Sequence, residues 1–297
     1  MTLVEFLQID LPALLTALLA CTLCAGLGNF LVLRRQALLG DAIAHAVLPG
    51  IVIGFLIVGT RSSGPMLAGA AAAAAVAGVL IEAVRRFGRV EPGASMGVVF
   101  TVMFALGVVL LQQGAAKQVD LDADCVLYGQ LEHVLWLSAS GWGSLLDPAA
   151  LADLPRELVT LAGLNVVTAL LAALFHKELK ITSFDPALAT TLGIPAGVFH
   201  YGLVLFLALA AVASFEAVGS ILVIAMLVCP PAAARMLTDR YGRQIALSLL
   251  FGAASAILGY AVAGPLPLWL GAGWALSAAG CIAVVSGLIL ALAILLG

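Results

Sequence analysis

Charge is scarce in this sequence. Only 10% of its 297 residues are Asp, Glu, Lys or Arg, whereas 63% are hydrophobic, and the mean hydropathy is +1.18. Because soluble domains usually carry about 25% charged residues, this composition excludes a soluble protein and leaves almost nothing for a soluble domain. The net charge of −3 carries no information about nucleic acid, since the charges lie in short segments between apolar runs.

Several features that would indicate an enzyme or a secreted protein are also missing. There is no glycine-rich phosphate loop of the GxxxxGK[ST] type, no catalytic triad and no nucleophile elbow. Met1–Asp10 has no basic region of the kind that opens a cleavable signal peptide. The five cysteines are scattered, and Cys21 and Cys24 lie inside an apolar run, so they are interpreted as packing residues. The chain shows no motif for hydrolysing ATP, so any energy that it uses must come from an ion gradient or from a separate ATPase.

The sequence does contain nine apolar runs that are long enough to span a bilayer. A hydrocarbon core of about 30 Å needs about 20 helical residues. The runs cover residues 11–33, 37–59, 66–84, 95–111, 158–175, 196–213, 217–236, 245–263 and 272–296. We predict an all-α polytopic membrane protein with about nine transmembrane helices in a single domain, 1–297. Pro49-Gly50 and Pro230-Pro231 fall inside runs and predict broken or kinked helices.

The basic residues lie mainly in one set of connecting segments. That set holds ten of the thirteen: Arg34, Arg35, Arg85, Arg86, Arg89, Lys177, Lys180, Arg235, Arg240 and Arg243. Since Lys and Arg concentrate in cytoplasmic loops, nine spans place the N-terminus outside and the C-terminus in the cytoplasm. The outer segment 112–157 contains Trp136 and Trp142, which suit an interfacial or partly re-entrant position. The odd number of spans requires that this segment does not cross the membrane.

The inner connection at residues 176–195 contains signals for a short helix. Asp185 is a candidate N-cap, Pro186 fits the first helical position, and Gly193 closes the helix after about two turns. A short capped helix between two spans on the cytoplasmic face is interpreted as a docking element for a partner.

Asp41 and His45 are candidate metal ligands. In a helix, positions i and i+4 share one face, and an Asp at the centre of a span costs roughly 2.5–3.5 kcal/mol unless a partner offsets that cost. The alternative is that the pair hydrogen-bonds the backbone. Asp41 also lies only six residues, about 9 Å, after Arg35, so a salt bridge to an arginine is possible. Two ligands from one helix are too few. A dimer about this helix would supply two carboxylates and two imidazoles, a set that suits manganese, iron(II) or zinc better than copper(I).

Other acidic residues are weaker candidates. Glu216 lies between the sixth and seventh predicted spans near the outer face, where it is either solvated or lines the mouth of a pathway. Asp120, Asp122 and Asp124 alternate in the outer segment and could raise the local cation concentration, although a solvated loop is the default interpretation. His133, His176 and His200 receive no role.

Four stretches of the sequence resemble the permease subunits of manganese/zinc/iron ABC importers. They are LRRQALLGDAIAHAVLPG at 33–50, ASMGVVFT at 94–101, FDPALATTLG at 184–193 and VGSILVIAMLVCPPAAAR at 218–235. Two features depart from the family pattern: residues 138–157 look longer than its usual outer segment, and no acid is expected at Glu216. The Ala-Val-Leu-Pro-Gly after His45 is closer to the manganese/iron branch.

The resemblance implies the large-importer fold shared with cobalamin importers, in a bacterial cytoplasmic membrane. It implies a dimer of permeases, identical or paralogous, with two cytoplasmic ATPases that bind ATP and an extracytoplasmic metal-binding protein. Asp41 and His45 fall on the family's intramembrane metal positions. A coupling helix at 184–193 would contact the ATPase, through Phe184, Asp185, Pro186, Leu188, Ala189, Leu192 and Gly193.

The predicted function is inward transport of Mn(II) by alternating access, with Fe(II) and Zn(II) as the other candidate substrates and no permanently bound cofactor. The alternative is a proton-coupled secondary carrier in which Asp41 and His45 shuttle protons without an ATPase. A membrane scaffold that transports nothing is disfavoured by the polar pair inside a span. The metal, the identity of the second permease and any re-entry of residues 131–157 stay open.

Overall fold

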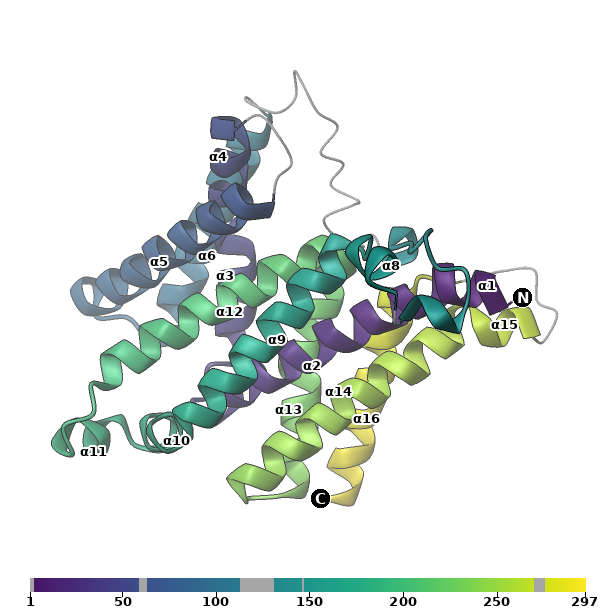
Figure 1. Ribbon diagram of the computed structural model, residues 1–297. Coiled ribbons are helices and arrows are strands. Elements are labelled where there is room, and N and C mark those ends of the chain that lie inside the picture. The colour runs from purple at the N-terminus through teal and green to yellow at the C-terminus, as the bar shows by residue number, and fades with distance from the viewer. Residues whose placement is uncertain (1–2, 59–62, 113–130, 146, 270–275) are drawn as a thin grey trace. The chain divides into compact units, whose positions relative to one another are not determined.

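The computed structural model describes residues 3–58, 63–112, 131–145, 147–269 and 276–297. Every regular element in these ranges is helical (Figure 1). Eight of the helices are long and apolar enough to cross a membrane: Phe6–Leu33, Ala68–Gly88, Gly93–Leu110, Arg156–Leu174, Ala196–Val218, Ser220–Leu237, Tyr241–Pro267 and Ala278–Leu296. The predicted all-α polytopic fold is confirmed, and eight of the nine apolar runs correspond to one long helix each.

The second run, 37–59, is not one helix. It forms α3 (Ala37–Ala46) and α4 (Leu48–Val58), which are separated at Val47. Pro49 has no N–H to donate to the carbonyl of His45, four residues earlier, and a proline ring clashes with that carbonyl in a continuous helix. Pro49 is instead tolerated in the first turn of α4, where Ile51 N donates to Val47 O at 3.1 Å. The predicted interruption at Pro49-Gly50 is therefore confirmed.

The predicted break at Pro230-Pro231 does not occur. Helix α13 (Ser220–Leu237) continues through both prolines. Pro231 cannot donate to the carbonyl of Leu227, and this carbonyl faces Gly28 of α2 (Leu11–Leu33), where a β-carbon would clash with it. The close approach of α2, which a glycine permits, packs this part of α13 within the protein.

The chain divides into two compact units. Unit 1 comprises Met1–Asn29, Asp124–Ala169 and Ala213–Gly297, and unit 2 comprises Phe30–Ala123 and Leu170–Val212. Three helices, α2, α9 (Arg156–Leu174) and α12 (Ala196–Val218), pass from one unit to the other. The remaining elements of unit 1 are α1 (Leu3–Glu5), η1 (Phe6–Asp10), η3 (Leu131–His133), η4 (Trp142–Leu145), α8 (Pro148–Ala152), α13, α14 (Tyr241–Ala263), α15 (Pro265–Trp269) and α16 (Ala278–Leu296).

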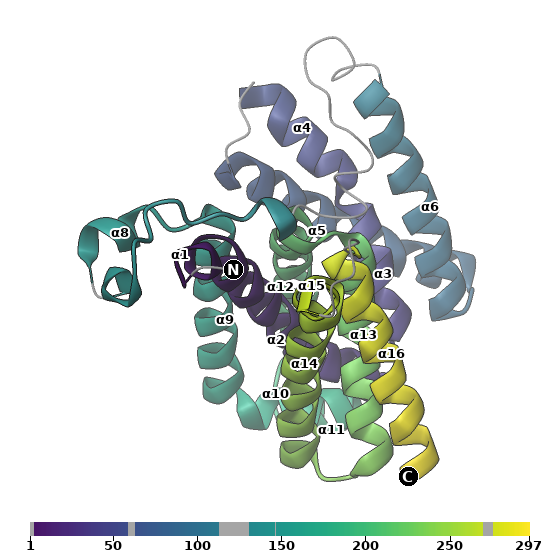
Figure 2. The same ribbon diagram turned by 90° about the vertical axis from the view of Figure 1, so that its right-hand side faces the viewer.

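Within unit 1, α13, α14 and α16 pack side by side (Figure 2). Gly259 of α14 lies so close to the backbone of Ile282 in α16 that a β-carbon would clash with it. Small residues of this kind let transmembrane helices approach closely. A buried polar contact also joins α14 to α2, because Gln244 Nε2 donates to Asn29 Oδ1 at 3.2 Å.

Two contacts place the chain ends at opposite ends of α14. Tyr260, near the end of α14, donates from its hydroxyl to Asp10 Oδ1 at 2.9 Å. Gly297 lies against the carbonyl of Met236, near the end of α13 and just before α14 begins. The N-terminal segment and the C-terminus of unit 1 therefore lie at opposite ends of this long helix.

The described part of the long outer segment, 131–145 and 147–155, contains only short helical turns and no spanning helix. Trp136 is buried with Leu7, Ala139 and Ala150, and its indole Nε1 donates to Ala150 O at 2.9 Å. Trp136 N also donates to Gln8 O at 2.9 Å. These contacts fix the segment against the N-terminal residues without a crossing.

Unit 2 contains α3, α4, α5 (Ser63–Gly88) and α6 (Pro92–Leu110), together with α10 (His176–Phe184) and α11 (Pro186–Thr191). Helices α3 to α6 pack against one another (Figure 1). The buried core between α3, α5 and α6 consists of Ala46, Ala73, Ala77, Val99 and Met103. Gly50 of α4 and Gly69 of α5 face each other so closely that neither position accommodates a β-carbon.

We expect Gly259→Ala to destabilise the protein. A methyl group there must displace the backbone of Ile282, and overpacking of this kind costs about 1–3 kcal/mol, more than the gain of roughly 0.5–1 kcal/mol from replacing a helical glycine by alanine. Thermal unfolding in detergent would show a lower midpoint. The matched control is Gly163→Ala in α9, where the space is open; an equal effect of both changes would contradict the packing argument.

Candidate functional site

Helix α3 carries both predicted metal ligands. Asp41 and His45 lie one turn apart within Ala37–Ala46, so the predicted helical i, i+4 spacing is present. The His45 ring is half-buried and packs against two aromatic rings of α6, with centroid distances of 5.2 Å to Phe100 and 5.4 Å to Phe104. These contacts restrict the imidazole to the side of α3 that faces α6.

The Asp41 side chain lies outside the described part of the structure. In the described ranges, no group of three or more His, Cys, Asp and Glu side chains is placed to hold a metal ion. His45 is therefore not accompanied by a complete ligand set in the described part of a single chain.

The short helix predicted at 184–193 is present as α11. Asp185 caps it, since its Oδ1 accepts from Leu188 N at 2.9 Å, and Pro186 occupies the first turn. Gly193 has φ +79, a left-handed conformation that favours glycine. Ile194 N donates to Ala189 O at 2.9 Å and ends the helix. The structure of this element therefore follows from three residues recognisable in the sequence.

Three large apolar side chains in and directly beside α11 are exposed. Phe184, Leu188 and Leu192 recur every four residues and are 52%, 50% and 60% exposed, whereas Ala189 is fully buried. Helix α11 packs against α10, which precedes it directly. These exposed apolar side chains, on a capped helix that is packed against α10, are suited to bind a partner surface.

A second polar cluster, which the sequence did not suggest, forms around Arg34. This residue follows directly after α2, and its guanidinium donates to three side chains. Nε donates to Ser183 Oγ at 3.3 Å, Nη2 to Thr182 Oγ1 at 3.4 Å, and Nη1 to His200 Nδ1 at 3.2 Å. His200 lies 166 positions away along the chain, and it had received no role. Burial lowers the pKa of Arg34 from its ordinary value, yet a guanidinium stays charged in proteins.

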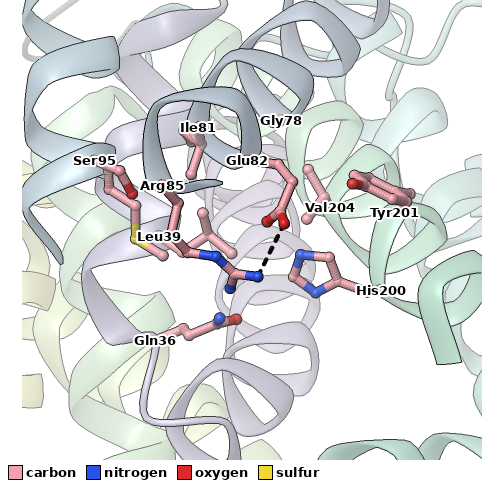
Figure 3. Close-up of a pocket in the computed structure, with 11 residues that line it drawn as sticks. Gln36, Leu39, Gly78, Ile81, Glu82, Arg85, Ser95, His200, Tyr201 and Val204 are labelled. Carbon is pink, nitrogen blue, oxygen red and sulfur yellow. Dashed lines mark hydrogen bonds and ion pairs between the residues drawn. The ribbon is translucent and has the colours of Figure 1, made fainter. Parts of the chain in front are cut away.

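A small cavity lies beside this cluster in unit 2. Its volume is about 30 Å³, and its lining includes Gln36, Leu39, Glu82, Arg85 and His200. Figure 3 shows the polar groups of these residues turned toward one another, with Arg85 bound to Glu82 at 2.9 Å. The Oε1 atom of Gln36 is buried and has no hydrogen-bond partner among the described residues. A small cavity with polar lining therefore lies at the start of α3.

Of the weaker candidate residues, the structure describes Glu216 but not the three outer aspartates. Glu216 is not in a loop between spans but in the last turn of α12, because α12 continues to Val218 and only Gly219, at φ +81, separates it from α13. Glu157 and Arg156 of α9 are the charged residues that act on it electrostatically. Asp120, Asp122 and Asp124 lie outside the described residues.

Comparison with known proteins shows the family. The chain matches the ABC 3 transport family over residues 5–136 and 149–297. The manganese transport system membrane protein MntD of Bacillus subtilis (strain 168) is 42% identical over 280 residues, or 94% of this chain and 89% of that protein. The zinc transport system membrane protein TroD of Treponema pallidum (strain Nichols) is 41% identical over 213 residues, or 71% of this chain and 54% of that protein. The gap in the family match lies largely within residues 138–157, the segment predicted to be unusually long.

Solved structures show the same fold. A chain of PsaBC from Streptococcus pneumoniae, in complex with a Fab, superposes with a TM-score of 0.73 at 29% identity, covering 95% of this chain and 89% of that chain. A metal-chelate type ABC transporter in an inward-facing conformation gives a TM-score of 0.62 at 15% identity, covering 99% and 88%. The predicted large-importer fold is thereby confirmed, and an ABC system replaces the alternative of a proton-coupled carrier. The chain thus belongs to the ABC 3 transport family, as a multi-pass membrane subunit of a bacterial ABC system whose ATP is hydrolysed by a separate subunit.

Proposed function

We propose that this chain is the permease of an ATP-driven importer of divalent metal ions, with Mn(II) as the main substrate and Fe(II) and Zn(II) as the other candidates. The proposal is carried by the position of Asp41 and His45 one turn apart on α3, in a chain similar to permeases named for manganese and for zinc. Carboxylate and imidazole ligands suit these ions.

The transported ion would be held between two permeases, either identical or paralogous. Asp41 and His45 of one copy and the corresponding pair of the other give two oxygen and two nitrogen donors. A site in a transport pathway must replace the water ligands of the ion and still release it. Oxygen and imidazole ligands meet both requirements better than a ring of thiolates, which would retain a soft or borderline metal.

An extracytoplasmic metal-binding protein would deliver the ion at the outer face. Glu216 and the outer acids Asp120, Asp122 and Asp124 would line the mouth of the pathway and raise the local cation concentration.

Helix α11 would transmit the closure of two cytoplasmic ATPases. The exposed apolar side chains of Phe184, Leu188 and Leu192, in α11 and directly beside it, supply a contact surface, while the cap at Asp185 and the left-handed Gly193 hold the turn in one conformation. A rigid, anchored helix transmits displacement better than a loop of the same length.

The whole chain, 1–297, would form one permease domain in the bacterial cytoplasmic membrane, with the N-terminus outside and the C-terminus in the cytoplasm. Three continuous helices pass from one unit to the other, which supports a single domain. The opposite positions of Asp10 and Gly297 along α14 support an odd number of crossings.

Loss of the ligand pair should abolish transport. In vesicles that contain the permease, its ATPase and its binding protein, we expect Asp41→Ala and His45→Ala to lower uptake at least about 10- to 100-fold, since the loss of even a second-shell partner costs that much. Uptake of Mn(II), Fe(II) and Zn(II) would be compared. His133→Ala, which removes an exposed imidazole, is the control. Full uptake in both ligand variants, with the ATPase assembled, would reject the site.

A charged side chain in place of the exposed Leu188 of α11 should weaken assembly with the ATPase. We expect Leu188→Asp to weaken binding about 30-fold, the effect of removing an interface residue worth about 2 kcal/mol. Co-purification of the ATPase with the permease measures this. Leu151→Asp makes the same change at a 40% exposed leucine of the outer segment and should leave the ATPase bound. Equal retention by both variants would show that α11 is not the docking element.

The orientation can be tested with introduced thiols. Asp153→Cys lies in the outer segment and Lys177→Cys in α10, so a membrane-impermeant maleimide should label the first variant in intact cells and the second only after permeabilisation. Labelling is measured above that of the parent protein. The reverse pattern would place the N-terminus in the cytoplasm.

A further inference from the structure

Arg34 binds both segments that flank α11. Thr182 and Ser183 belong to the last turn of α10, which ends at Phe184 directly before α11. His200 lies in the second turn of α12, which begins at Ala196 directly after α11. One guanidinium therefore holds the two ends of the loop that carries α11.

The same residue belongs to the connection that leads into α3. Arg34, Arg35 and Gln36 separate α2 from Ala37, the first residue of α3. The turn is tight, since Gln36 N donates to Leu31 O at 2.8 Å, and Arg35 adopts the left-handed region at φ 57. A displacement of Arg34 along the helix axis is therefore passed to the start of α3 rather than absorbed by a long linker.

A small cavity lies next to the turn. The cavity of about 30 Å³ is lined by Gln36 and by Leu39 of α3, and His200 lines it from α12 (Figure 3). At the other end, α3 stops at Ala46, before the break at Val47. Helix α3 is thus bounded by non-helical residues at both ends, and the cavity lies at the end nearer Arg34.

We propose that Arg34 is a positioning residue for import, which connects the loop that carries α11 to the helix that carries Asp41 and His45. When the ATPases move α11, the three bonds of Arg34 carry that movement from α10 and α12 to α3. Arginine suits this task because its planar fork makes several directed bonds at once, whereas lysine acts as a single point charge. The inference rests on the proposed role of α11 and on that of the ligand pair.

The test measures metal uptake and ATP hydrolysis in the same vesicles, which hold permease, ATPase and binding protein. For Arg34→Gln we expect ATP hydrolysis within about twofold of the parent and uptake lower by about tenfold, so that the number of ions imported per ATP falls about tenfold, within the usual range of coupling effects. Arg34→Lys keeps the charge but not the fork and should restore only part of this ratio. Arg35→Gln, the same change at the exposed neighbouring arginine, should leave the ratio unchanged.

The partner side chains provide a second measurement. His200→Gln should lower the ratio of ions to ATP in the parent, but it should add little in the Arg34→Gln background, because the bond between the two residues is already absent. An unchanged ratio in Arg34→Gln would overturn the proposal, and so would a fall of uptake and hydrolysis in parallel with the amount of assembled complex. A failure of the proposed docking role of α11 can be distinguished from a failure of this inference, because Leu188→Asp would then leave the ATPase bound.

Discussion

Backbone hydrogen bonding in hydrocarbon constrains this structure more than any single side-chain contact. Unpaired N–H and C=O groups cost several kcal/mol away from water, so the described spans are nearly continuous helices and irregular backbone is confined to a few positions. One such position is Val47, two residues after His45. In α13, by contrast, Pro230 and Pro231 remove two donors without interrupting the helix, and the carbonyl of Leu227 faces Gly28. Proline alone therefore does not decide where a span is broken; the packing around the freed carbonyls also matters.

Close helix contacts at glycines and the cavity at the start of α3 have different consequences for the movement of the helices. Glycines remove the space between neighbouring helices at Gly28, Gly50 and Gly259, where a β-carbon would clash with backbone. Such contacts leave little room for a shift, because packed interiors are not continuously deformable. The start of α3 is different, since a cavity lies beside Gln36 and Leu39. Rigid packing of α4, α13, α14 and α16 therefore coexists with one short helix that has space at one end.

Much of the fold could be predicted from the sequence because bilayer thickness fixes the length of an apolar run. The short helix α11 was also predictable, since Asp185, Pro186 and Gly193 act on their own neighbours. The i, i+4 relation of Asp41 and His45 followed from helix geometry alone. The cluster of Arg34 with Thr182, Ser183 and His200 was not predictable, because it joins residues about 150 positions or more apart. The prediction that Glu216 lies between two spans was wrong, because helix α12 continues beyond the expected end of the apolar run.

The length of α3 bears directly on how an ion could be both held and released. Ten helical residues extend about 15 Å, or half of the hydrocarbon core, so α3 does not span the membrane alone. Because non-helical residues bound it at Arg34–Gln36 and at Val47, a tilt of α3 as a rigid body would leave its internal hydrogen bonds intact. In the proposed mechanism, such a movement would carry the positions of Asp41 and His45 together and change their distance from the corresponding residues of the second permease. A site with four ligands would thereby become two sites with two ligands each, which would lower the affinity for the ion.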